Sequence, residues 1–200
     1  GGVVHSAAQS KPGFGYGSSV FFDGANDYLT VTYTLPSIWT ARFWIYITSL
    51  SATRSVFFNG NTAINANRYL VQVLTDGRLG LYAEAGGGVT VLDITSQTGA
   101  ISINNWYHVE AYRNGTSSGL FLNGVLIGSA TLSETPSLPS TLYIGLGRQG
   151  GAERYFLGYM NDFEIVENAV LHTADFTPPS RLLGTVGTTS ANPIKGPDNN

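Results

Sequence analysis

Residues 157–165 read Leu-Gly-Tyr-Met-Asn-Asp-Phe-Glu-Ile, and residues 174–179 read Ala-Asp-Phe-Thr-Pro-Pro. The first stretch has the two-residue alternation of a strand, with the odd-numbered residues from Leu157 to Ile165 pointing one way and the even-numbered residues the other. The second stretch is predicted to be a strand that stops at Pro178 and Pro179, because proline cannot donate a hydrogen bond to a sheet ladder.

The same alternation recurs along most of the chain, with turn signals between the strands. Residues 40–48 carry apolar side chains on both faces, which predicts a central strand. Asp76-Gly77 and Asn123-Gly124 predict two-residue hairpin turns. We expect about a dozen strands and one short helical turn near residues 168–172, and we interpret the Gly-x-Gly of residues 145–150 as a loop.

These patterns predict an all-β fold, a two-sheet antiparallel jelly-roll sandwich over residues 18–183. Residues 1–17 are rich in glycine and serine and predict an extended N-terminal arm. Residues 184–200 are too polar to form a core and predict an extended C-terminal tail. A chain of 200 residues suits one such domain.

The composition excludes several classes of function. The net charge is −3 and no basic run is present, so we expect no nucleic-acid partner. No apolar stretch of ~18 residues exists, so we expect no membrane insertion. The chain has no cysteine, which excludes disulfides and thiolate metal sites.

Five segments carry a resemblance to a known family: residues 22–29, 105–109, 120–128, 143–145 and 158–165. Together they resemble a laminin-G-like domain of the concanavalin A-like jelly-roll superfamily. The resemblance implies the sandwich fold. This architecture carries lectins, glycosidases and structural modules alike, so it leaves the function open.

The ending at residues 169–179, with Phe176-Thr177-Pro178-Pro179, is similar to laminin-G-like modules of tailed-bacteriophage virion proteins. That resemblance implies a non-enzymatic structural or adhesive module on the virion surface, as a capsid decoration or tail-associated protein. Residues 1–17 and 184–200 would then contact other copies of the chain or other virion proteins, and a host surface glycan is a further candidate partner. The alternatives are a carbohydrate-binding module of a larger secreted protein and, less favoured, a polysaccharide hydrolase.

A glycan site needs aromatic rings for the apolar faces of sugars and polar side chains for their hydroxyl groups. The candidate glycan-binding residues are Trp39, Asn59, Asn61, Arg68, Tyr82 and Tyr155. Trp39 precedes the central strand directly and fits a core position equally well.

Four oxygen donors of the kind that calcium prefers are Asp23, Asn26, Asp27 and Asp162. The superfamily resemblance implies a structural ion between the opening turn and the late strand that contains Asp162. The alternative is that the first three are turn residues bonded to their own backbone and that Asp162 is a hydrogen-bonded carboxylate. We therefore expect either no cofactor or one structural calcium.

The sequence offers two weak catalytic pairs. A glycosidase needs two carboxylates that lie roughly 5–10 Å apart. Asp162 and Glu164 share one predicted strand face. His108 and Glu110 also share a face and could form part of a general base. No nucleophile can be placed beside either pair, so we expect a protein that is not an enzyme.

Overall fold

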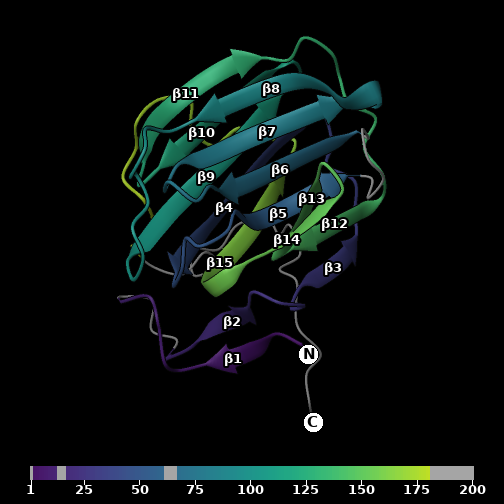
Figure 1. Cartoon of the computed structure of the whole chain (residues 1–200). Coiled ribbons are helices and arrows are strands. Elements are labelled where there is room, and N and C mark those ends of the chain that lie inside the picture. Colours follow the sequence, from purple (N-terminus) through teal and green to yellow (C-terminus); the bar gives the residue numbers. More distant parts are fainter. Residues whose placement is uncertain (1, 13–16, 61–66, 181–200) are drawn as a thin grey trace.

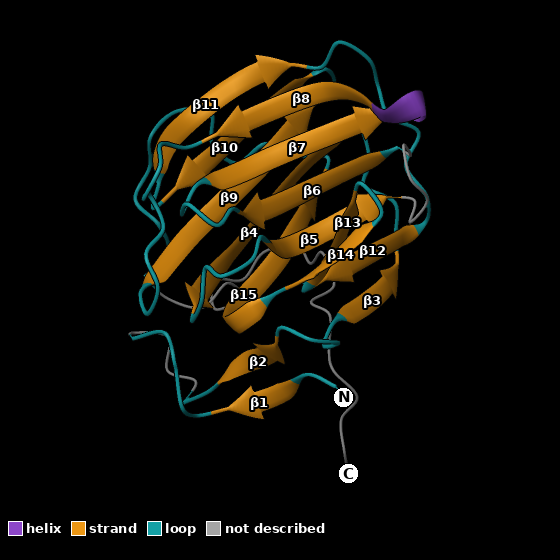
Figure 2. Cartoon of the chain, viewed as in Figure 1, coloured by secondary structure: helices purple, strands orange, loops and turns teal. Residues whose placement is uncertain are grey.

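Two antiparallel sheets pack face to face in the computed structural model, which describes residues 2–12, 17–60 and 67–180 (Figures 1 and 2). In spatial order, the seven-stranded sheet comprises β1 (Val4–Ser6), β2 (Ser19–Asp23), β15 (Leu157–Glu167), β4 (Ile38–Ile47), β9 (Trp106–Asn114), β10 (Ser117–Leu122) and β11 (Val125–Thr131). The six-stranded sheet comprises β3 (Leu29–Thr32), β12 (Thr141–Ile144), β5 (Arg54–Gly60), β6 (Arg68–Val73), β7 (Leu79–Ala85) and β8 (Val89–Thr95). The predicted all-β jelly-roll sandwich is confirmed.

The remaining described elements are small. A two-stranded hairpin is formed by β13 (Leu146–Gln149) and β14 (Ala152–Tyr155), and a 3-10 turn, η1, spans Gly86–Gly88. Within the described residues, no helix is long and apolar enough to cross a membrane.

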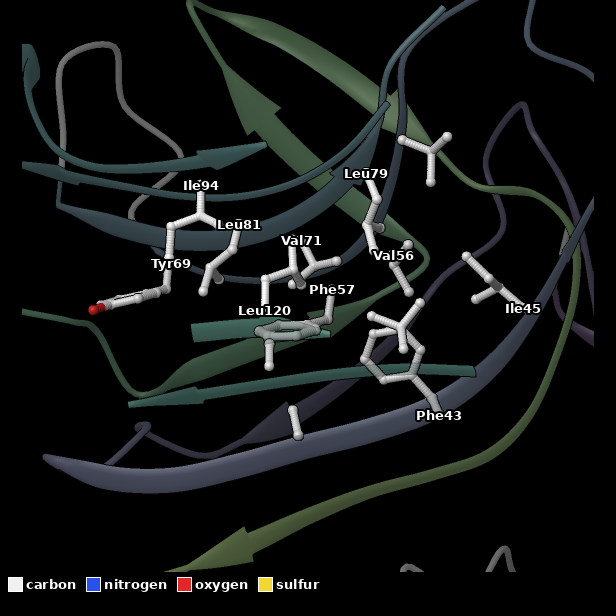
Figure 3. Packing of buried hydrophobic residues seen from close by; sticks show 14 of the residues in the cluster. Phe43, Ile45, Val56, Phe57, Tyr69, Val71, Leu79, Leu81, Ile94 and Leu120 are labelled. Atoms are coloured by element: carbon white, nitrogen blue, oxygen red, sulfur yellow. The ribbon is translucent and has the colours of Figure 1, made fainter. Parts of the chain in front are cut away.

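The core lies between the two sheets and follows from the two-residue alternation of each strand. Phe43 and Ile45 of β4 face Phe57 of β5 and Val71 of β6, and all four side chains are fully buried (Figure 3). The rings of Phe43 and Phe57 meet edge to face, with their centroids 6.0 Å apart. As predicted for a strand that is apolar on both faces, β4 is central, between β15 and β9.

The predicted alternation of residues 157–165 is correct only as far as Asn161. A β-bulge between Asn161 and Glu164 shifts the register of β15 against β4. Asp162 lies within the bulge and has a positive φ of 56°. Before the bulge Tyr159 contacts rings on the outer face, whereas after it Phe163 stacks on the core residue Phe43. Tyr159 and Phe163 therefore lie on opposite faces, contrary to the prediction.

The turn predictions were partly right. Asn123-Gly124 forms the two-residue turn between β10 and β11, and both residues have positive φ. The loop at Asp76-Gly77 does join two paired strands, but it has three residues, because the Leu74 N–H donates to the Arg78 carbonyl.

Two predictions near the termini need correction. Residues 168–172 form no helical turn and residues 174–179 form no strand. This segment instead crosses the outer face of the seven-stranded sheet, held by a hydrogen bond from the Phe176 N–H to the Gly124 carbonyl. The predicted N-terminal arm contributes a strand, since β1 pairs with β2, and the predicted tail 184–200 lies outside the described residues.

The β13–β14 hairpin replaces the loop expected at residues 145–150, and it lies on the outer face of the six-stranded sheet (Figure 1). Gly145 sets its departure from β12. The Gly145 N–H donates to the Val56 carbonyl, and the Gly145 carbonyl accepts from the Phe156 N–H. Gly145 has a φ of 84°, and a β-carbon here would lie 2.4 Å from the ring of Phe22. Only glycine fits this position, because it has no β-carbon and tolerates a left-handed backbone.

We predict that Gly145→Ala lowers the free energy of unfolding by about 2–4 kcal/mol, because it combines a left-handed backbone with overpacking. Gly99→Ala is the matched control, since Gly99 has a φ of 76° but no atom within 4 Å of the added β-carbon. Urea denaturation of both variants measures the difference. Equal losses for the two variants would contradict the packing role of Gly145.

Candidate functional site

A row of side chains crosses the outer face of the six-stranded sheet. The strand registers place Tyr143, Phe58, Leu70, Tyr82 and Asp93 opposite one another on β12, β5, β6, β7 and β8. Their sequence neighbours on these strands point into the core, so this row points outward. Phe58 and Leu70 are nevertheless fully buried because the β13–β14 hairpin covers them. The hairpin thus divides the outer face into two parts.

The hairpin is fixed by buried polar contacts. The Arg68 guanidinium, which is 1% exposed, donates from Nη1 to the Arg148 carbonyl at 2.6 Å, and its Nε lies 2.8 Å from Glu84 Oε2. Gly147 lies so close to β5 that a β-carbon would meet Ser55 Oγ at 2.2 Å. These contacts leave the hairpin little freedom to move over the sheet.

On one side of the hairpin lies a polar pocket of about 290 Å³. Strands β6, β7 and β8 form its floor, and the hairpin forms one wall. Its lining comprises Thr53, Gln72, Leu74, Arg78, Gly80, Tyr82, Asp93, Thr95, Gln149 and Arg154. One aromatic ring, two guanidinium groups, one carboxylate, two amides and two threonine hydroxyls therefore converge on a single hollow.

Hydrogen bonds orient the aromatic ring of this pocket. The Tyr82 hydroxyl donates to Glu84 Oε1 at 2.7 Å, and Thr90 Oγ1 lies 2.7 Å from the same hydroxyl. Burial raises the pKa of the Tyr82 hydroxyl, so it stays protonated at neutral pH. The hydroxyl end of the ring is therefore anchored to Glu84 on β7 and Thr90 on β8.

The charged groups of the pocket have different hydrogen-bond partners. Arg154 Nη1 donates to the side-chain oxygens of Gln72 at 2.5 Å and of Gln149 at 2.6 Å. Arg78 Nε pairs with Asp76 Oδ2 at 2.7 Å. Across the pocket, Asp93 Oδ1 accepts from the Thr95 hydroxyl at 2.7 Å.

On the other side of the hairpin lies a cluster of three tyrosines. The ring of Tyr28 is 6.0 Å from that of Tyr143 and 6.4 Å from that of Tyr155, and Tyr28 is 42% exposed. The Tyr155 hydroxyl donates to Glu153 Oε2 at 2.5 Å. This tyrosine cluster is a second partly exposed aromatic surface beside a carboxylate.

The structure separates the five predicted glycan-binding residues that it describes. Tyr82 lies in the polar pocket and Tyr155 in the tyrosine cluster, and their contact with a glycan stays a prediction. The prediction is wrong for Trp39, which is fully buried against the rings of Phe57 and Tyr69.

The prediction is also wrong for Asn59 and Arg68. Asn59 is fully buried, and its side chain bonds the backbone of Leu35, Tyr33, Pro139 and Thr141. Arg68 holds the hairpin from beneath. Asn61 lies outside the described residues.

Sequence reasoning missed most of the pocket. Gln72 and Gly80 could have been found, because each alternates with apolar core residues on its strand. Arg154 could not have been found from the sequence, because its position depends on where the hairpin docks.

The family follows from a match between residues 23–174 and the sequence model described as the concanavalin A-like lectin/glucanases superfamily. The chain belongs to this superfamily. No curated protein sequence matches the chain.

Solved structures resemble this member of the superfamily in fold. Domain 4 of the extracellular arabinanase AbnA from Geobacillus stearothermophilus, in complex with arabinotriose, has a TM-score of 0.61 and 14% identity over 84% of this chain and 76% of that chain. The CBM40 of the Ruminococcus gnavus IT-sialidase, bound to α2,3-sialyllactose, has a TM-score of 0.57 and 15% identity over 68% and 79%. The heptameric SAP-like pentraxin of Limulus polyphemus has a TM-score of 0.54 and 20% identity over 72% and 73%.

The four predicted calcium ligands do not come together in this superfamily member. Asp23 lies opposite Leu157 on β15. Asp162 lies five residues further along that strand, a separation of ~17 Å at the usual rise per residue. Asp162 instead lines an apolar cleft of about 280 Å³ at the sheet edge. The described residues contain no group of three or more His, Asp or Glu side chains that could hold a metal.

In the opening turn, the carboxylates of Asp23 and Asp27 accept from the turn's own backbone, as the alternative to calcium expects, and one oxygen remains for a cation. Asp23 Oδ1 accepts from the backbone of Ala25 and Asn26, and these hydrogen bonds lower the pKa of the Asp23 carboxyl. Asp27 is 4% exposed, and its Oδ1 has no hydrogen-bond partner among the described residues. A structural calcium therefore stays a prediction that rests on Asp23, Asn26 and Asp27, without Asp162.

Neither predicted catalytic pair is formed as expected. Glu164 is bound to Arg42, with Glu164 Oε2 2.6 Å from Arg42 Nε, and the bulge sets Asp162 apart from it. Glu110 is fully buried and both of its oxygens lie near His172 Nδ1, at 2.9 and 3.0 Å. The partner of Glu110 is thus His172 from the crossing C-terminal segment, and not His108.

His108 is buried between the rings of Trp44 and Phe176. Burial, together with the nearby positive charge of Arg42, lowers the pKa of His108 to about 3. The imidazole is therefore neutral at physiological pH, and it lies too deep to act on a substrate.

The buried His108 makes the stability depend on pH. In the window between its unfolded pKa of 6.5 and its folded pKa of about 3, the unfolded chain binds a proton that the folded chain does not. We predict that this group lowers the free energy of unfolding by up to about 1.4 kcal/mol for each pH unit of acidification within that window.

The measurement compares urea denaturation of the wild type and His108→Phe at several pH values across this window. The variant keeps an aromatic ring between Trp44 and Phe176 but cannot titrate, so its stability should fall less steeply. Parallel curves for the two proteins would contradict the assignment of a depressed pKa to His108.

Proposed function

We propose that this chain is a non-enzymatic carbohydrate-binding module that holds a glycan on the outer face of its six-stranded sheet. The observation that carries the proposal is the polar pocket beside the β13–β14 hairpin, where an anchored tyrosine ring meets converging hydrogen-bonding groups. Ligand sites combine a concave surface with a few oriented polar groups, and this pocket has both.

The chemistry of the pocket matches that of a sugar. Tyr82 offers a ring face to C–H groups, while Asp93 and Gln149 offer acceptors to hydroxyl protons and Arg154 offers donors to hydroxyl oxygens. The tyrosine cluster beyond the hairpin adds a second stacking surface on the same face. Two of the similar folds, the AbnA domain and the CBM40, were solved with sugars, which supports the same class of ligand here.

The non-enzymatic part of the proposal rests on the carboxylates. Glu164 is paired with Arg42, and the buried Glu110 is paired with His172, so neither is free to act on a glycosidic bond.

A finer part of the proposal is the adhesive role on a virion surface. The resemblance of the ending at residues 169–179 to laminin-G-like modules of tailed-bacteriophage virion proteins supports it. The placement of the described terminal segments also supports it, because both contact the seven-stranded sheet: β1 pairs with β2, and Phe176 bonds Gly124. Attachment through the terminal regions, residues 1–17 and 184–200 included, would leave the opposite, glycan-binding face exposed.

A glycan microarray, followed by calorimetric titration of arabinotriose, α2,3-sialyllactose and the best array ligand, tests the proposal. We expect Tyr82→Ala to weaken binding by about tenfold, because truncation of an aromatic side chain that anchors a ligand costs about 1–2 kcal/mol. Tyr46→Ala is the matched control, since Tyr46 is a partly buried tyrosine on the outer face of the other sheet.

Two results would overturn the proposal. One is the absence of any bound glycan on the array, and the other is equal loss of binding in Tyr82→Ala and Tyr46→Ala. Release of reducing sugar from a bound polysaccharide would overturn its non-enzymatic part.

A further inference from the structure

We infer that the polar pocket selects an acidic sugar, a glycan residue that carries a carboxylate beside its hydroxyl groups. The inference rests on the proposed function and adds the chemical class of the ligand. It comes from how two of the three charged groups in the pocket, Arg154 and Asp93, are placed and partnered.

Arg154 differs from the other arginines of the described chain. Arg42, Arg68, Arg78 and Arg148 each pair with a carboxylate. Arg54 and Arg113 donate to backbone carbonyls. Arg154 lines the pocket, and its hydrogen-bond partners among the described residues are the neutral amide oxygens of Gln72 and Gln149.

A guanidinium group in this setting favours an anionic ligand. The group is charged at every accessible pH, and the hairpin takes part of it out of water without supplying a negative charge. Both amide oxygens accept from the same nitrogen, Nη1, so N–H groups on the other two nitrogens remain for a ligand. A carboxylate matches that planar set of donors with two charge-assisted hydrogen bonds.

The rest of the pocket favours a sugar over a small inorganic anion. Asp93 lies on β8, two strands away from Gln72 on β6. Two strand spacings, together with an offset of two residues along β8, put these two positions ~12 Å apart. The Asp93 carboxylate accepts hydrogen bonds from hydroxyl groups and disfavours a second anion. A single ligand can bind both charged groups of the pocket when its carboxylate reaches Arg154 and its hydroxyl groups reach Asp93.

Gly80 provides the space between those two ends. It lies on β7 opposite Gln72 on one side and Thr95 on the other, and its neighbours Leu79 and Leu81 point into the core. A β-carbon at Gly80 would meet no atom closer than 3.6 Å, so one can be added without a close contact. Glycine here leaves a hollow that a side chain would fill, which makes Gly80→Val a steric block of the pocket.

The experiment measures binding to matched pairs of probes by calorimetric titration. One pair is trigalacturonic acid and its fully methyl-esterified form, and the other is α2,3-sialyllactose and lactose. Inorganic phosphate and sulfate serve as competitors. The proteins are the wild type, Arg154→Gln, Gly80→Val and the control Arg148→Gln, which lies on the same hairpin but pairs with Glu153.

We expect the acidic member of at least one pair to bind about tenfold or more tightly than its neutral partner, because hydrogen bonds to a charged group are stronger than those between neutral groups. Arg154→Gln should remove that difference, Arg148→Gln should keep it, and Gly80→Val should abolish binding of both members. Salt of about 1 M, where the Debye length is ~3 Å, should weaken the acidic probe selectively. Near-ultraviolet circular dichroism confirms that each variant is folded.

The failures of the two proposals are distinguishable. In one case Gly80→Val abolishes glycan binding, but the wild type binds neutral and acidic probes equally or Arg154→Gln keeps the preference for the acidic probe. The acidic-sugar inference is then wrong and the proposed function stands. If phosphate or sulfate displaces the acidic probe at concentrations close to the dissociation constant of that probe, the pocket is an anion site and the inference is wrong. If Gly80→Val leaves glycan binding unchanged, the pocket is not the glycan site and both proposals fail.

Discussion

The architecture of the candidate site depends on one buried guanidinium, that of Arg68. This group lies between the six-stranded sheet and the hairpin, where it pairs with Glu84 and donates to the Arg148 carbonyl. A buried charge is tolerable only when it is paired and hydrogen-bonded. Because the Arg148 carbonyl belongs to the hairpin, the Arg68 guanidinium has this hydrogen bond only when the hairpin is docked. The same docking buries Phe58 and Leu70 and gives the pocket a wall.

The outer faces of the two sheets are covered by different segments of the chain. On the seven-stranded sheet, the segment after β15 crosses the strands, and its His172 Nδ1 lies within hydrogen-bond distance of the buried carboxylate of Glu110. Phe176 from the same segment covers the rings of His108 and Phe121. On the six-stranded sheet, the short hairpin covers only the middle of the face. Polar groups are therefore left open to solvent on one face, and the other is largely occupied by its own chain.

Membership of the concanavalin A-like lectin/glucanases superfamily accounts for the sandwich but not for the site. The solved structures described above share less than a quarter of their residues with this chain, and at that level of identity the likeness is one of fold. The outer face of the six-stranded sheet is shaped by local features of this chain: the hairpin after Gly145, the glycine at position 80, and an arginine held by two glutamines. These features, and not the family, carry the arguments about the ligand.

The sequence by itself determined the sandwich, the central position of β4 and the turn at Asn123-Gly124, because alternation and turn chemistry act between residues close in the chain. The bulge at Asp162, the burial of Trp39 and the pairing of Glu110 with His172 were decided only in the tertiary structure. The same is true of the pocket, since Arg154 and Gln72 are 82 positions apart in the chain and meet only once the hairpin has docked. Local patterns specify which face of a sheet a side chain lies on, whereas contacts between distant segments specify which groups it packs against or bonds on that face.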